Sequence, residues 1–69
     1  MSKLEKTVIK IVEIEARWWP PPRRRIAAVL REHFGITIAV AKLSTILRRL
    51  RRDGDLVCCG TVYLPRSKP

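Results

Sequence analysis

The stretch Gly35–Leu64, GITIAVAKLSTILRRLRRDGDLVCCGTVYL, decides the fold of this chain. Its apolar residues recur at spacings of three and four, the period of a helix with one buried face. These residues are Ile36, Val40, Leu43, Ile46, Leu47 and Leu50. At about 100° per residue, the opposite face holds Ala41, Thr45, Arg48 and Arg52, with Arg49 beside them. The pattern predicts a basic amphipathic helix over residues 38–53, ending at Asp53-Gly54, with Thr37 as a candidate cap.

A short β-hairpin is expected directly after this helix, over residues 56–64. Leu56–Cys58 and Thr61–Leu64 have strand character and surround a Cys59-Gly60 turn, where glycine suits a tight hairpin. A two-stranded hairpin is marginal alone, so it must pack on the helices. Residues 65–69 form a basic tail that is free to contact phosphates.

Two further helices are expected before residue 35. Ser2-Lys3-Leu4-Glu5 is a capping-box pattern and predicts a helix over residues 3–17. Trp18–Pro22, WWPPP, ends that helix, and a second one follows over residues 23–34 with Gly35 as its terminator. The chain is therefore predicted to be one mostly α domain, residues 1–69, with three helices and a small hairpin (class α+β).

The first helix is apolar over most of its circumference. A helix with so wide an apolar arc is usually buried on two sides. In a small protein the second side can belong to another copy, which predicts a homodimer through this helix. The interface residues would be Leu4, Val8, Ile9, Ile11 and Val12. The alternative is that the wide arc wraps around a small core.

The paired tryptophans and the paired cysteines each have two interpretations. Trp18 and Trp19 are expected to cover the end of the core, because large aromatic side chains enlarge a small one. The alternative is that one of them binds a partner or stacks on a base. Cys58 and Cys59 are expected to point to opposite faces of a strand, one inward and one outward, in preference to forming an intermolecular disulfide.

The charge distribution predicts a polyanionic partner. Fifteen Lys and Arg residues against six Asp and Glu give a net charge of +9. Residues 1–16 sum to zero, so the whole excess lies from Arg17 onward. Arg23, Arg24 and Arg25 crowd the first turn of a helix, where the dipole disfavours cations, and a bound phosphate backbone would compensate. A solvated run of charge is the alternative.

Catalytic, metal-binding and membrane functions find little support in the sequence. His33 is the only imidazole, so Cys58 and Cys59 cannot complete a four-ligand zinc site with it. There is no phosphate-cradling glycine loop, and the chain is small for a substrate cleft. We expect no enzyme, no cofactor, no metal and no small-molecule ligand. The absence of a long apolar segment and of a signal-peptide pattern predicts a cytoplasmic protein.

The order of elements resembles the winged helix-turn-helix superfamily of DNA-binding domains. The best-matching stretch is Ile46–Val57, ILRRLRRDGDLV, which looks like the end of a recognition helix running into the first strand of a wing. The resemblance implies that the third helix enters the major groove of DNA. It further implies that the residues facing the bases are Thr37, Ala41, Lys42, Thr45, Arg48 and Arg49. Those holding phosphates would be Arg23, Arg24, Arg25, Arg52 and Arg66.

The leading hypothesis is a double-stranded DNA-binding protein, a small homodimeric transcriptional regulator that reads two half-sites about 34 Å apart. When bound to DNA, such a protein would be associated with the nucleoid. A second hypothesis is a winged-helix module that binds protein, with the charge serving solubility. A third is binding of nucleic acid without sequence preference, which needs the cations but no particular groove-facing residues.

Overall fold

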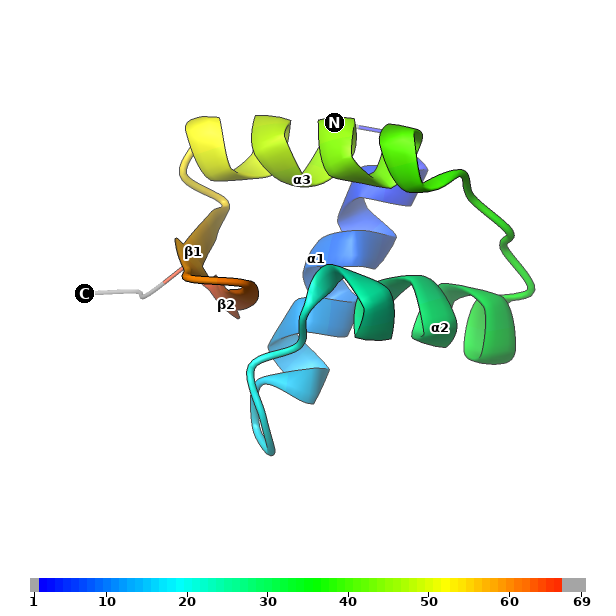
Figure 1. Ribbon diagram of the computed structural model, residues 1–69, viewed down its shortest axis with the longest axis horizontal. Helices are drawn as coiled ribbons and strands as arrows, with labels where there is room; N and C mark the ends of the chain where they lie inside the picture. Colours follow the sequence, from blue (N-terminus) through cyan, green and yellow to red (C-terminus); the bar gives the residue numbers. More distant parts are fainter. Residues whose placement is uncertain (1, 67–69) are drawn as a thin grey trace.

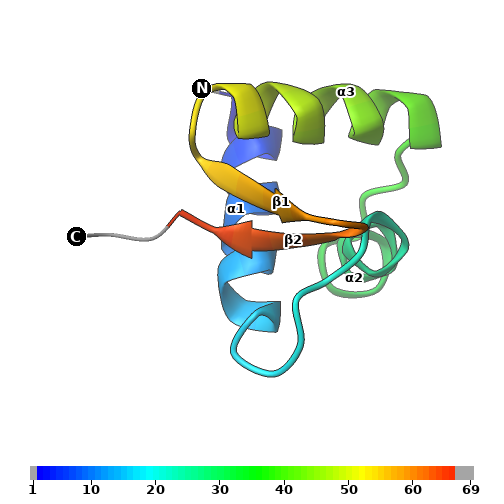
Figure 2. The same cartoon turned by 60° about the vertical axis from the view of Figure 1, so that its left-hand side comes forward.

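Three helices and a C-terminal antiparallel hairpin make up the fold, as the sequence predicts (Figure 1). The computed structural model describes residues 2–66. The helices are α1 (Lys3–Glu15), α2 (Arg23–Phe34) and α3 (Val40–Arg52), and the strands are β1 (Leu56–Cys59) and β2 (Val62–Pro65). In both views α3 runs across one end of the molecule, and the other elements lie to one side of it (Figures 1 and 2).

One apolar core joins all three helices and the first strand. Each helix contributes a stripe of three buried residues at helical spacing, and β1 adds one leucine. The core consists of Val8, Ile11, Val12, Ile26, Val29, Leu30, Leu43, Leu47, Leu50 and Leu56. Because the domain is small, this single cluster supplies most of its hydrophobic stabilisation.

The N-terminus of α1 has the predicted capping box. The Glu5 N–H donates to Ser2 Oγ at 3.2 Å, and the Ser2 N–H donates to Glu5 Oε1 at 3.3 Å. The helix ends at Glu15, two residues before the predicted end. There the N–H groups of Trp18 and Trp19 both donate to the Glu15 carbonyl at 3.0 Å, so a tight turn replaces the last helical residues before the prolines.

The predicted dimer interface on α1 is wrong for three of its residues. Val8, Ile11 and Val12 are between 0% and 1% exposed, so they cannot line a contact between two folded copies. The apolar arc of α1 is covered on two sides by the same chain, because α2 and β2 both pack against this helix. Leu4 and Ile9 are partly buried at the edge of the core. The width of the arc therefore reflects a small core with neighbours on two sides.

The prediction that the tryptophans cover the core is also wrong. Trp18 is 78% exposed and Trp19 is 81% exposed. Pro21 is fully buried in their place, and its carbonyl accepts from the Tyr63 N–H at 2.9 Å. The loop between α1 and α2 is thereby attached to β2, with both indoles left in solvent.

The connection from α2 to α3 is longer than the predicted tight turn. Gly35 closes α2 in the left-handed conformation, at φ 65°, where glycine carries no steric penalty. Residues 36–39 then run outside any helix, and α3 begins at Val40 with Ala39 as its N-cap residue. Thr37 is not the cap, since it lies two residues before Ala39. No side chain caps α3, so its start follows from the burial of its leucines.

The hairpin pairs Leu56 with Pro65 and Cys59 with Val62, which places its turn at Gly60-Thr61. That is one residue later than predicted. Leu56 is buried, and Cys58, two residues on, is half-buried on the same side of the strand. Cys59 is exposed and both thiols are free, in agreement with one inward and one outward cysteine.

The capping box predicts an acid-sensitive contribution to stability. Hydrogen bonds from the Ser2 side chain and then from the Ser2 backbone lower the pKa of Glu5, and nearby Arg49 adds to this against the opposing effect of burial. A carboxyl whose pKa is lower in the folded state stabilises the fold above its unfolded pKa and loses that contribution as the pH falls through its folded pKa. We expect Glu5→Gln to flatten the dependence of the urea midpoint on pH, between about pH 7 and pH 3.

Glu13→Gln is the matched control for this measurement, because Glu13 is an exposed carboxylate on the same helix. It should keep the wild-type pH dependence. An unchanged pH profile in Glu5→Gln would contradict the stabilising role of the Glu5 carboxylate.

Candidate nucleic-acid interface

The outer face of α3 is open to solvent along its whole length. Ala41, Thr45, Arg48 and Arg52 are all exposed, as the helical wheel predicts, because the buried leucines occupy the other side. Thr45 Oγ1 donates to the Ala41 carbonyl at 3.0 Å, which fixes the threonine rotamer and leaves its methyl group available. No other element covers this side in either view of the ribbon (Figures 1 and 2).

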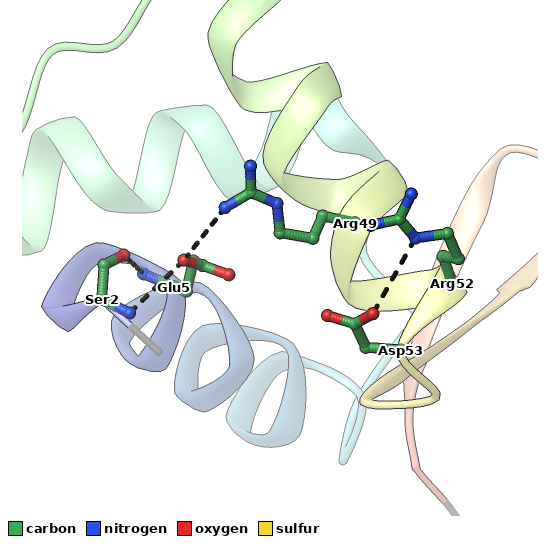
Figure 3. A network of polar contacts seen from close by, with 5 residues as sticks. All are labelled: Ser2, Glu5, Arg49, Arg52 and Asp53. Atoms are coloured by element: carbon green, nitrogen blue, oxygen red, sulfur yellow. Dashed lines mark hydrogen bonds and ion pairs between the residues drawn. The ribbon is translucent and has the colours of Figure 1, made fainter.

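Lys42 and Arg49 flank the outer face on the side toward the start of α1. Arg49 is directed toward that helix, and its Nη1 atom lies 3.8 Å from Glu5 Oε1 (Figure 3). The Arg49 side chain remains 57% exposed, so the pair is weak and solvent-screened. Arg49 is therefore less free than Arg48 to contact a ligand lying on the outer face.

Thr37 does not belong to the outer face of α3. It lies in the connection before the helix and lines a hollow between α2 and α3 together with Arg23, Arg24 and Arg31. The structure therefore separates Thr37 from the other residues expected to read bases and groups it with the arginines of α2. The helix starts later than predicted, which accounts for the difference.

The three arginines at the start of α2 differ in what they contact. Arg23 Nη1 donates to Ser44 Oγ on α3 at 2.7 Å, and Arg24 forms no ion pair with any described residue. Arg25 Nε donates to Glu15 of α1, and this contact raises the pKa of Arg25 above its ordinary value. Arg25 is thus already neutralised within the chain, whereas Arg23 and Arg24 remain cations without an acidic partner among residues 2–66.

A polar hollow with three arginines lies beside the outer face of α3. Its lining includes Arg23 from α2, Arg48 and Arg51 from α3, and Tyr63 from β2, around Ser44. Within residues 2–66 no acidic side chain forms an ion pair with any of these three guanidinium groups. Such an arrangement suits an anion that accepts several charge-assisted hydrogen bonds.

Sequence reasoning overlooked Arg51 as a member of this group. Arg51 lies on the flank of α3 that faces the start of α2, about two helical turns on from the serine that Arg23 contacts. The helical wheel carries that signal, because Ser44, Arg48 and Arg51 are spaced four and three apart. What the wheel alone does not show is that α2 delivers Arg23 to the same flank.

The remaining predicted phosphate contacts lie at the far end of α3 and of the chain. Arg52 Nε is 3.9 Å from Asp53 Oδ1, and with 79% of its side chain exposed this pair is weak (Figure 3). Arg66 is exposed at the end of the described chain. The rest of the predicted basic tail, residues 67–69, lies outside the described residues.

Comparison with protein-family models, with curated proteins and with solved structures found no match. Within residues 2–66, no three His, Cys, Asp or Glu side chains are grouped so as to share a metal ion. In the same part of the chain, no helix combines the length and the apolar character needed to cross a bilayer.

Proposed function

We propose that the protein binds double-stranded DNA with the outer face of α3 and acts as a small transcriptional regulator. The observation that carries the proposal is the arrangement of α3, whose exposed outer face lies beside Arg23, Arg48 and Arg51, three cations that form no ion pair within residues 2–66. The resemblance of Ile46–Val57 to the end of a recognition helix in winged helix-turn-helix domains agrees with this interpretation.

The dimensions of α3 suit the major groove. Thirteen residues give a helix roughly 20 Å long at 1.5 Å per residue. The groove of B-DNA is about 12 Å wide, which admits one helix with its side chains. Because α3 runs across one end of the molecule, α1 and α2 do not stand between its outer face and a duplex (Figure 1).

The residues proposed to read bases are Ala41, Lys42, Thr45 and Arg48. Arginine suits the two acceptors of guanine, while the methyl groups of alanine and threonine suit the thymine methyl. Arg49 lies at the edge of this set because it is directed toward Glu5. A face with one alanine, one threonine and one free arginine can discriminate base pairs, which favours sequence-specific recognition over binding to phosphates alone.

The residues proposed to hold phosphates surround that face. Arg23 and Arg51 do so from the polar hollow, Arg24 from the start of α2, and Arg52 and Arg66 from the far end. Contacts of this kind set the position of the protein on the duplex and carry no sequence information. Arg25, engaged by Glu15, is proposed to contribute little.

A salt titration tests duplex binding itself. We expect a fluorescent duplex of random sequence to bind, with the logarithm of the affinity falling linearly with the logarithm of salt concentration. About five phosphate contacts give a slope near −4.5, at roughly −0.9 per contact. Fluorescence anisotropy measures both quantities. No binding at about 20 mM salt would overturn the proposal, since electrostatic attraction is strongest there.

Substitutions on α3 separate base reading from phosphate contacts. We expect Arg51→Ala to weaken all duplexes alike and to reduce the salt slope by about 1. Arg48→Ala should cost about 1–3 kcal/mol on a selected site and less on random sequence. Lys10→Ala is the control, because Lys10 is an exposed cation on α1. A uniform loss with Arg48→Ala would instead indicate binding without sequence preference.

Arg24 and Arg25 make a matched pair of adjacent cations. We expect Arg24→Ala to weaken duplex binding more than Arg25→Ala, because Glu15 already holds Arg25. Glu15→Gln should release Arg25 and raise the affinity for duplex at low salt. Anisotropy titrations of the three variants under one salt condition give the comparison. Equal losses for Arg24→Ala and Arg25→Ala would show that the ion pair does not withhold Arg25 from DNA.

A further inference from the structure

Exposed apolar side chains gather around the C-terminal end of α1. Six large apolar side chains are exposed among residues 2–66; three of them lie at the C-terminal end of α1, and a fourth lines a hollow together with one of these three. Trp18 and Trp19 follow α1, Ile14 lies in its last turn, and Phe34 at the end of α2 lines the same hollow as Ile14. We call these four residues the indole face. Clustering of this kind marks an interaction surface, whereas single exposed apolar residues need no explanation.

The indoles are exposed on a loop that is attached at both ends. At its start, two backbone N–H groups donate to the Glu15 carbonyl, and at its end Pro21 and Pro22 pair with the backbone of β2. Arg25 of α2 contacts the Glu15 side chain beneath the loop. Since the backbone is held on both sides, the exposure of Trp18 and Trp19 is a property of the fold.

A duplex on α3 does not cover the loop that carries Trp18 and Trp19. In both views the loop after α1 lies at the end of the molecule opposite to α3 (Figures 1 and 2). The exposed tryptophans therefore call for an occupant other than the DNA proposed above.

The charges near the indole face are balanced, unlike those of the chain as a whole. Lys10 and Glu13 lie on the last turns of α1, and Arg17 follows the end of that helix. Beneath the loop, Arg25 is engaged by Glu15 and attracted by Glu32. The three cations and three carboxylates cancel, while the whole chain carries +9. A polyanion gains nothing from such a surface, but a second strongly basic copy meets no net repulsion there.

The region also carries an apolar hollow for an indole to enter. Ile14 and Phe34 are the exposed apolar side chains of its lining, and Glu15 borders both this hollow and the one beside the tryptophans. In an isologous contact the same surface of each copy meets the other, so that surface must carry both the projecting side chains and the hollow that receives them. Projecting indoles and a neighbouring apolar hollow meet that requirement.

We propose that the indole face joins two copies of this chain, with Trp18 and Trp19 of each protomer packing into the hollow beside Ile14 and Phe34 of the other. This interface replaces the one expected from the apolar arc of α1, whose central residues are buried. Aromatic anchors entering apolar pockets dominate the binding energy of such contacts. The association does not depend on nucleic acid, so it can be tested apart from the proposed function.

The two tryptophans are the only ones in the sequence, so intrinsic fluorescence reports directly on this surface. In buffer without nucleic acid, we expect the emission to shift to shorter wavelength as the concentration rises from about 1 to 200 µM, a range suited to a small interface. Sedimentation equilibrium should show the mass rising from 8.0 kDa toward twice that value over the same range.

Substitutions assign the interface to particular residues. Trp18→Ala and Trp19→Ala should each weaken association by about tenfold or more, and Ile14→Glu should abolish it by placing a charge in the hollow. Since the two indoles are exposed, their removal leaves the core intact, which circular dichroism checks. Val57→Ala, another exposed apolar residue but on β1, and Arg48→Ala on α3 should leave association unchanged.

A chain that stays monomeric at about 200 µM, with solvent-exposed emission throughout, would overturn the proposal. So would a dimer whose affinity survives all three substitutions in the indole face. Duplex binding by a monomeric chain would leave the proposed function standing while removing this one.

Discussion

The rest of the structure depends on the packing of one side of α3 into the core, through its buried residues Leu43, Leu47 and Leu50. These three leucines face α2 and the first strand, and they lie in one cluster with the buried stripe of α1. Their burial fixes the rotation of α3 about its axis, because the side of the helix that carries them must face the core. It therefore also determines which residues face outward. The same packing brings the end of the helix over Leu56, where the hairpin begins.

Local signals in the sequence predict the elements of this fold well. The bounds of α2 agree with the prediction, since Pro22 and Gly35 impose conformations that a helix cannot extend past. The capping box of Ser2 and Glu5 places the start of α1 in the same way. Signals of this kind act between neighbouring residues, so the helix bounds that they set do not depend on contacts with distant parts of the chain.

The sequence predicts less well what covers each face. The apolar arc of α1 shows that this helix is buried on two sides, but its composition does not reveal that α2 and β2 supply the cover. In the loop after α1 the buried residue is Pro21, whose carbonyl accepts from the Tyr63 N–H, and Trp18 and Trp19 are left in solvent. In both cases the deciding contact joins residues far apart in the chain, and periodicity carries no information about such contacts.

For the candidate site, too, the sequence predicts local features well and long-range contacts poorly. The helical wheel identifies the outer face of α3 correctly, with Ala41, Thr45 and Arg48 exposed. The state of each arginine, however, depends on distant acids. Glu15 engages Arg25, and Glu5 draws Arg49 away from the face. The composition does not distinguish these cations, whereas the structure shows which of them form an ion pair with an acidic side chain and which do not.

The loop that carries Trp18 and Trp19 lies at the end of the molecule opposite to α3, which has a consequence for architecture (Figure 1). Two copies joined at their indole faces, as proposed above, would present their α3 helices on opposite outer surfaces of the pair. Such a pair cannot lay both helices into neighbouring turns of one duplex, as a reader of palindromic half-sites must. It would clasp two separate DNA segments instead, closing a loop between distant sites or drawing neighbouring duplexes together.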